Sequence, residues 1–142
     1  MTAYFDTSAV VKLVIDETGA AVVRRVWESA THVVSSVCLY PETRAALARA
    51  RRDHRLDEVS LRAAVRAFES LWAALERVVV SLRLAQRAGL LAHELPLRGY
   101  DAVHLAAAAT VRSPTTLFVT ADRQLSAAAA HLGFDVVGVP DA

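Results

Sequence analysis

The sequence predicts an α/β domain of three α/β/α layers, in which helices cover both faces of a mostly parallel central sheet of about five strands. Short runs rich in β-branched and aromatic residues alternate with helical patterns along the chain, which is the order typical of parallel sheets. The apolar residues of each run are consecutive and do not alternate with polar ones, as expected for strands that are covered on both faces. The chain has 142 residues, 54% of them hydrophobic, and no proline- or glycine-rich linker divides it, so we expect a single domain over residues 1–142.

Short apolar segments are expected to form the strands of this sheet. In chain order they are residues 3–5, 32–34, 77–80, 116–119 and 135–137. The segment 116–119 is short, but its position is informative because an acidic residue follows it closely.

Helical patterns fill the intervals between these segments. Apolar residues recur at three- and four-residue spacing from Leu61 to Leu75, which predicts a helix with one buried face. Ser81 is expected to cap the helix that runs through Leu91. Gly133 is expected to end the helix that begins near Arg123.

Charge and cysteine content exclude several classes of protein. The chain carries 16 basic and 15 acidic residues, whereas a protein that coats itself with nucleic acid usually has a larger positive excess. The single cysteine, Cys38, cannot form an internal disulfide, so nothing requires an oxidising compartment. The N-terminus lacks the pattern of a signal peptide, and the longest apolar stretches are too short to cross a bilayer. We therefore expect a soluble, cytoplasmic protein with no membrane partner.

Four acidic residues fall where a parallel sheet binds its ligands, at the carboxyl ends of the strands. Asp6 follows the first predicted strand and Asp122 follows the fourth. Glu42 lies one to two turns into the helix after the second strand, and Asp101 lies at the start of a helix that can face the same edge.

Each acid also has an ordinary explanation when it is taken singly. Asp101 and Asp122 are suited to capping helices, Asp6 to a turn, and Glu42 to a solvated helix face. Taken together they point to a cation, because carboxylates about 4 Å apart repel by roughly 4 kcal/mol per pair at an effective dielectric constant near 20. Oxygen ligands without a companion histidine or cysteine cluster favour Mg²⁺ or Mn²⁺ over zinc.

Several segments carry a resemblance to a known family. They are residues 4–9 with 12–13, residues 35–36 leading to 42–47, residues 100–108, and residues 119–125 followed by Gly133. In this order and spacing the chain resembles the PIN-domain ribonucleases, in particular the VapC toxins of toxin–antitoxin modules, over nearly its whole length. The resemblance implies a PIN-like fold and an acidic site of Asp6, Glu42, Asp101 and Asp122, with Asp6 and Asp101 most directly tied to the metal. It also implies supporting hydroxyl groups at Thr120 and Ser8.

The resemblance further implies an endoribonuclease toxin that depends on Mg²⁺ or Mn²⁺, is restrained by a cognate VapB-type antitoxin and forms a homodimer. The metal would activate a water for hydrolysis of an RNA phosphodiester, leaving a 5′-phosphate and a 3′-hydroxyl. Glu42 or Asp122 is a candidate to help deprotonate that water. Pro41 precedes Glu42, and a proline there removes a backbone donor early in the helix and can bend it, which bears on the placement of Glu42.

Two other features have competing interpretations. Arg44 is a candidate contact for RNA or antitoxin, whereas a solvated helix face is favoured for Arg49, Arg51, Arg52 and Arg55 over contact with RNA phosphates. His104 is either a proton-transfer group or a core histidine with a satisfied hydrogen bond, and the second interpretation is favoured.

Alternative functions are a catalytically idle PIN-fold binding module and a PIN nuclease that is not a toxin. A receiver domain and an aspartyl phosphatase are disfavoured. The first needs an acidic pair after the first strand and a late lysine, and the second needs another acid at the position of Ser8. The only lysine of the chain is Lys12.

Overall fold

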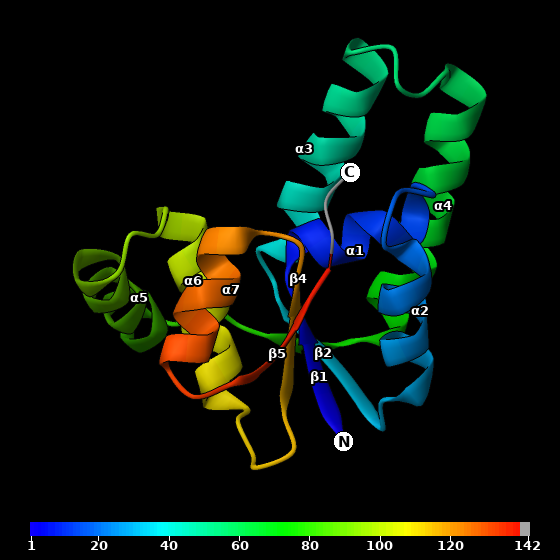
Figure 1. Cartoon of the computed structure of the whole chain (residues 1–142). Helices are drawn as coiled ribbons and strands as arrows, with labels where there is room; N and C mark the ends of the chain where they lie inside the picture. Colours follow the sequence, from blue (N-terminus) through cyan, green and yellow to red (C-terminus); the bar gives the residue numbers. More distant parts are fainter. Residues whose placement is uncertain (140–142) are drawn as a thin grey trace.

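A five-stranded, all-parallel sheet with strand order β3-β2-β1-β4-β5 forms the centre of the computed structural model, which describes residues 1–139 (Figure 1). The strands are β1 (Thr2–Phe5), β2 (His32–Ser36), β3 (Glu76–Val78), β4 (Leu117–Thr120) and β5 (Asp135–Gly138). Each predicted strand overlaps an observed one, and the predicted α/β class with a parallel sheet is confirmed.

Helices cover both faces of the sheet. They are α1 (Thr7–Val14), α2 (Ala20–Ser29), α3 (Leu39–Arg52), α4 (Glu58–Ala74), α5 (Leu82–Glu94), α6 (Gly99–Thr110) and α7 (Arg123–His131). One core cluster joins Tyr4 and Phe118 of the sheet to α5, α6 and α7, and a second joins Phe5 and Val119 to α1–α4. Because neighbouring strand residues point to opposite faces, Tyr4 and Phe5 enter different clusters, and the predicted three layers are confirmed.

The predicted helix ends are also observed. The Ser81 hydroxyl accepts a hydrogen bond from the backbone N–H of Leu84 at 3.1 Å and so caps α5. Gly133 lies just beyond α7 with φ of 86°, a left-handed conformation that glycine adopts without steric cost. These caps place the ends of α5 and α7 where the sequence predicts them.

The hairpin of α3 and α4 extends past the carboxyl edge of the sheet, away from α6 and α7 (Figure 1). Leu39, Thr43, Leu47 and Ala50 form the buried stripe of α3. The hairpin thus forms a wall beside the edge where the strands end. Within residues 1–139, no helix combines the length and the apolar character needed to span a membrane.

Candidate active site

All four predicted acids line one cleft of about 680 Å³ at the carboxyl edge of the sheet. Asp6 follows β1, Asp122 follows β4, Glu42 lies in the first turn of α3 and Asp101 in the first turn of α6. Four segments that are far apart in sequence therefore contribute carboxylates to the same space.

Asp6 is the most deeply buried of these acids, with 3% of its surface exposed. Its carboxylate caps α1 by accepting the backbone N–H of Ala9 at 3.0 Å, and it also accepts the hydroxyls of Ser8 at 2.8 Å and Thr120 at 2.8 Å. Burial raises the pKa of Asp6 above its ordinary value, although His104 and these hydrogen bonds act in the opposite direction. Asp6, for which the sequence suggested ordinary turn chemistry, is thus the N-cap of α1, and its burial makes its charged form costly without a cation.

Ser8 and Thr120 also connect the ends of β1 and β4. The Ser8 hydroxyl accepts the backbone N–H of Ala121 at 2.9 Å, and the Thr120 hydroxyl accepts that of Asp122 at 3.0 Å. Each hydroxyl therefore orients the Asp6 carboxylate while it fixes the loop that carries Asp122.

Glu42 belongs to a second hydrogen-bonded group. Its Oε1 atom lies 2.7 Å from Nε2 of His104 and accepts the Thr7 hydroxyl at 3.0 Å. The other ring nitrogen of His104, Nδ1, lies 2.9 Å from the hydroxyl of Tyr4. His104 is 1% exposed, so the prediction of a core histidine with satisfied hydrogen bonds is correct, and its partner is a cleft acid.

Pro41 does not move Glu42 out of the cleft. Pro41 is the third residue of α3, where a backbone N–H would have no partner within the helix. The next residue, Glu42, donates its N–H to the carbonyl of Cys38 at 3.2 Å, which is the first regular hydrogen bond of the helix.

The capping explanation holds for Asp122 but is wrong for Asp101. Asp122 accepts the N–H of Leu125 at 2.9 Å at the start of α7. The N-cap of α6 is Arg98, and Asp101 is the third residue of that helix, with its carboxylate turned toward the cleft.

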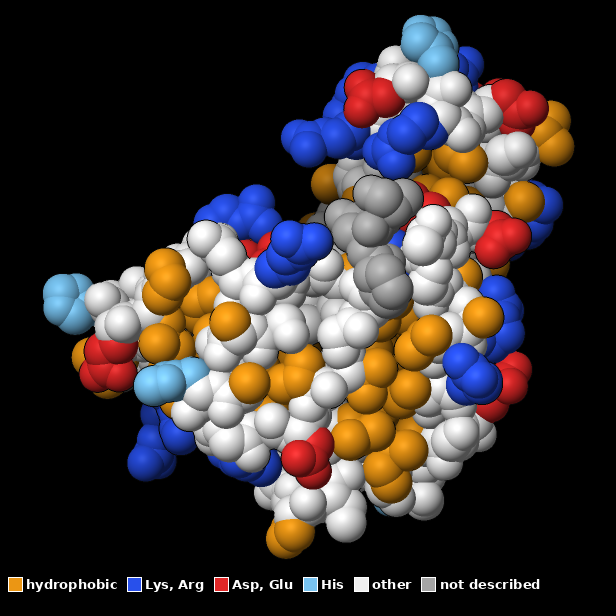
Figure 2. Space-filling model, viewed as in Figure 1, with side chains coloured by type: hydrophobic (Ala, Val, Ile, Leu, Met, Phe, Trp, Pro, Cys, Tyr) orange, Lys and Arg blue, Asp and Glu red, His pale blue; other side chains and the backbone are white. Residues whose placement is uncertain are grey.

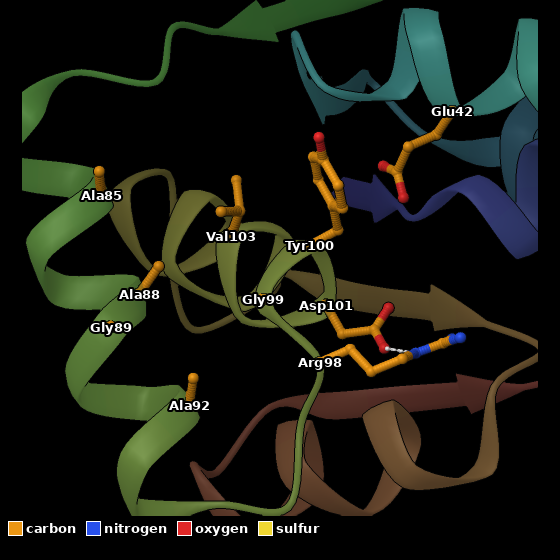
Figure 3. A pocket seen from close by; sticks show the side chains of 10 residues that line it. All are labelled: Glu42, Ala85, Ala88, Gly89, Ala92, Arg98, Gly99, Tyr100, Asp101 and Val103. Atoms are coloured by element: carbon orange, nitrogen blue, oxygen red, sulfur yellow. Dashed lines mark hydrogen bonds and ion pairs between the residues drawn. The ribbon is translucent and has the colours of Figure 1, made fainter.

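Arg98 was not predicted from the sequence, yet its guanidinium contacts two of the acids. Its Nε donates to Asp101 Oδ2 at 3.2 Å (Figure 3), and its Nη2 lies 3.6 Å from Asp122 Oδ2. Burial and the nearby Asp122 raise the pKa of Asp101, against the lowering effect of Arg98. The only sequence signal was the spacing of three residues between Arg98 and Asp101, which is typical of a helical ion pair.

The residues of the cleft fit a divalent cation in their chemistry. They present carboxylate and hydroxyl oxygens, and Asp101 and Asp122 already share one cation, the Arg98 guanidinium. Among the described residues, however, no three His, Cys, Asp or Glu side chains are close enough together to hold a metal ion. Binding would therefore require Arg98 and the carboxylates to rearrange.

An adjoining pocket of about 660 Å³ lies between α5 and α6, and the cleft residues Glu42, Arg98 and Asp101 border it (Figure 3). Small residues of α5, among them Ala88 and Gly89, form much of its wall. Glu42 and Asp101 therefore lie at the boundary between the polar cleft and the more apolar pocket beside α5.

Not every predicted contact faces the cleft. Arg44 lines neither cavity and instead donates to the Tyr40 hydroxyl at 3.1 Å and pairs with Glu69 of α4 at 3.5 Å. Arg49, Arg52 and Arg55, for which the sequence favoured a solvated helix face, line the cleft together with the acids.

Comparisons with known proteins agree with this geometry. The family model of the PIN domain matches residues 3–131. The chain is 44% identical over 135 residues to "Ribonuclease VapC45" of Mycobacterium tuberculosis, which covers 95% of this chain and 90% of the relative. Among solved structures it is similar to the sarcin–ricin-loop-cleaving toxin VapC20 of M. tuberculosis, with a TM-score of 0.69, 22% identity and coverage of 93% and 95% of the two chains. It is also similar to VapBC2 of Rickettsia felis bound to a promoter DNA fragment, with a TM-score of 0.64, 11% identity and coverage of 98% and 99%. The chain belongs to the PIN-domain family.

Proposed function

We propose that this protein is a metal-dependent endoribonuclease toxin of a VapBC-type toxin–antitoxin system. The observation that carries the proposal is the meeting of Asp6, Glu42, Asp101 and Asp122 in one cleft of a PIN-domain chain. The curated relative with 44% identity over most of both chains is named as a ribonuclease, which supports RNA as the substrate.

Asp6, Glu42, Asp101 and Asp122 are the residues that would hold Mg²⁺ or Mn²⁺. Such an ion, when bound, offsets charge on the scissile phosphate and lowers the pKa of a water. Burial raises the pKa of both Asp6 and Asp101, and a bound cation would favour their charged forms.

The protein's own side chains orient these carboxylates. Ser8 and Thr120 donate to Asp6 and leave the carboxylate little freedom to rotate. His104 and Thr7 hold Glu42 in the same way. Partners of this kind typically change metal affinity or activity by about 10–100-fold when they are removed.

Proton transfer is assigned to Glu42. An ionised carboxylate only accepts hydrogen bonds, so we assign the proton between Glu42 and His104 to Nε2, and Nδ1 then accepts the Tyr4 hydroxyl. A Glu42 carboxylate held in this way can accept a proton from the attacking water. Attack of that water on phosphorus breaks the bond to the 3′-oxygen, which takes a proton from solvent, and leaves a 5′-phosphate and a 3′-hydroxyl.

Arg98 has a second role in this proposal. Its side chain is 79% exposed, so its pairing with Asp101 and Asp122 is weak and exchangeable. When the acids bind a cation, the guanidinium is free to donate two parallel hydrogen bonds to two oxygens of an RNA phosphate.

The partners in this proposal are a cognate VapB-type antitoxin and a second copy of the chain. A similar solved structure is a toxin–antitoxin complex from Klebsiella pneumoniae, which supports the first. We expect the antitoxin to reach the acidic cleft, so that the complex is inactive.

The test is cleavage of single-stranded RNA by the purified chain with Mg²⁺, with Mn²⁺ and with excess chelator. We expect cleavage only with metal, and its loss in Asp6→Asn and Asp101→Asn. Equal cleavage in chelator would contradict the metal mechanism. A parent protein that binds RNA without cutting it under any of these conditions would instead indicate an idle binding module.

A further inference from the structure

The wall of the cleft formed by α3 carries a basic stripe that continues directly from the acids. Glu42, Ala45, Ala46, Arg49 and Arg52 all line the cleft, at spacings of three or four residues that place them on one face of the helix. At 1.5 Å per residue, Arg49 lies about 10 Å and Arg52 about 15 Å along the helix axis from Glu42. The two alanines between the acid and the arginines have small side chains, so they do not obstruct this face of the helix.

The guanidinium groups of Arg49 and Arg52 are available to a ligand. Both residues are exposed, and within residues 1–139 neither has a recorded ion pair or side-chain hydrogen bond. By contrast, Arg44 and Arg51 of the same helix are paired with Glu69 and Glu58 of α4. On one side of α3 the arginines form ion pairs with α4, whereas the arginines on the side that lines the cleft remain available to a ligand.

Arg55 extends the stripe beyond the end of α3. The N–H of His54 donates to Arg51 and that of Arg55 to Ala50, and His54 has φ of 60°, so a tight C-terminal turn fixes the backbone of Arg55. Its guanidinium lies 3.8 Å from Glu17 across the cleft, a half-exposed pair that is readily exchanged for another anion. Figure 2 shows basic side chains on both sides of the hollow between the α3–α4 hairpin and the rest of the molecule.

We propose that Arg49, Arg52 and Arg55 form a track that binds RNA phosphates on one side of the scissile bond. The inference rests on the proposed ribonuclease function and extends it by assigning the direction in which the substrate leaves the acids, along α3 toward the tip of the hairpin. The ligand that suits the site is a polyanion, which can place phosphates at both ends of the cleft. The arginines bind phosphates directly, whereas the acids bind a phosphate only when a cation lies between them. Contacts of this kind give affinity and register without base specificity.

The test measures binding of a fluorescent single-stranded RNA in chelator, where no cleavage is expected, as a function of salt concentration. The variant is Arg49→Ala/Arg52→Ala. The matched control is Arg44→Ala/Arg66→Ala, which removes the same charge from the α3–α4 hairpin at positions outside the cleft. Affinity falls as salt rises, and each lost phosphate contact should make the slope of log affinity against log salt less steep by about 0.7. The control should keep the parent's slope. Arg49→Lys/Arg52→Lys should restore most of the slope, because lysine keeps the charge.

With metal present, the same double variant should raise KM for a long RNA and leave kcat near that of the parent, since the track binds ground state and transition state alike. Parent and variant should cleave a dinucleotide equally, because it is too short to reach the track. An unchanged salt slope in the double variant, or an equal fall in the control, would overturn the proposal. Polyglutamate is titrated alongside the RNA as an acidic peptide. If the double variant loses binding to polyglutamate but keeps its binding to RNA, the ligand of the track is an acidic peptide and the proposal is overturned. A parent that never cleaves RNA would overturn the proposed function alone, because the binding measurement does not depend on cleavage.

Discussion

The imidazole of His104 joins Glu42 to the core: Nε2 lies 2.7 Å from the Glu42 carboxylate, while Nδ1 lies 2.9 Å from the buried hydroxyl of Tyr4. The position of a cleft acid on α3 is therefore set by a residue of α6 and, through it, by a residue of β1. This connection is made entirely by side chains whose main chains belong to three different elements.

His104→Asn should lower kcat by about 10–100-fold, because Glu42 loses the partner that orients it. RNA affinity in chelator should stay near that of the parent, since the His104 side chain is buried beneath Glu42. Tyr4→Phe provides the graded comparison: it leaves Nδ1 without its hydroxyl partner at a cost of about 1–3 kcal/mol in stability. If His104→Asn reduces RNA affinity and leaves kcat unchanged, His104 does not act through Glu42. Activity assays, RNA titrations and thermal melts of the two variants decide this.

Asp101→Asn should be at least as stable as the parent in chelator, because it removes one of the charges gathered in the cleft while nearly keeping the shape of the side chain. It should gain less in Tm from added Mg²⁺, since a metal that binds only the folded state stabilises it less when it binds more weakly. Asp101 caps no helix, so this comparison involves no change of cap. Thermal melts with and without Mg²⁺ make the measurement. The absence of a Mg²⁺-dependent shift in the parent, or an identical shift in the variant, would mean that these carboxylates share no metal.

Arg98→Gln should lower the Mg²⁺ concentration at which Tm begins to rise, because the metal no longer competes with the guanidinium for Asp101 and Asp122. RNA cleavage at saturating Mg²⁺ should fall, since the phosphate loses a bidentate donor. Stability in chelator should change by less than about 1 kcal/mol, as the Arg98 side chain is largely exposed. A higher Mg²⁺ requirement in the variant would mean that Arg98 assists the metal. Arg123→Gln, at the start of α7, is the matched control.

Asp6 and Asp57 should respond to pH with opposite signs in chelator. Both cap a helix by accepting a backbone N–H, but the pKa of Asp6 is raised by burial, whereas hydrogen bonds from Ser60 lower the pKa of exposed Asp57. A raised pKa means that the folded state binds the proton more tightly, so the parent should gain stability relative to Asp6→Asn as pH falls through the folded pKa of Asp6. A lowered pKa means that the folded state binds the proton less tightly than the unfolded state does, so stability is lost as pH falls. The parent's advantage over Asp57→Asn should be present above the unfolded pKa of Asp57 and be lost as pH falls toward the folded one.

Asparagine caps about as well as aspartate, so the backbone cap is kept in both variants. Asp6→Asn also loses an acceptor for the Ser8 and Thr120 hydroxyls, so only the pH-dependent part of its stability difference reports the charge. Denaturant unfolding of the parent and the two variants, from neutral to acidic pH, measures the two slopes. Equal slopes for Asp6 and Asp57 would show that burial does not control the protonation of Asp6.

Much of the fold and all four acids were predictable from sequence because each depends on local patterns and one topological rule. The apolar runs identify the strands. Ser81 marks a helix start by its side-chain hydroxyl and Gly133 a helix end by its left-handed backbone, while parallel strands bring Asp6 and Asp122 to a common edge. Even Glu42, preceded by a proline, lies where expected, because a proline in the first turn breaks no helical hydrogen bond.

The tertiary structure decided which polar side chains work with these acids. Glu42 and His104 are 62 residues apart, and no periodicity predicts that they meet. The same holds for the arginines of α3. The spacing of apolar residues in the sequence indicates the buried side of α3. It leaves an exposed flank on each side of that stripe, one with Arg44 and the other with Arg49 and Arg52. Only the packing of α4 against the first flank turns the second toward the acids, because a helix's own sequence specifies which side is apolar and not which neighbour covers the side next to it.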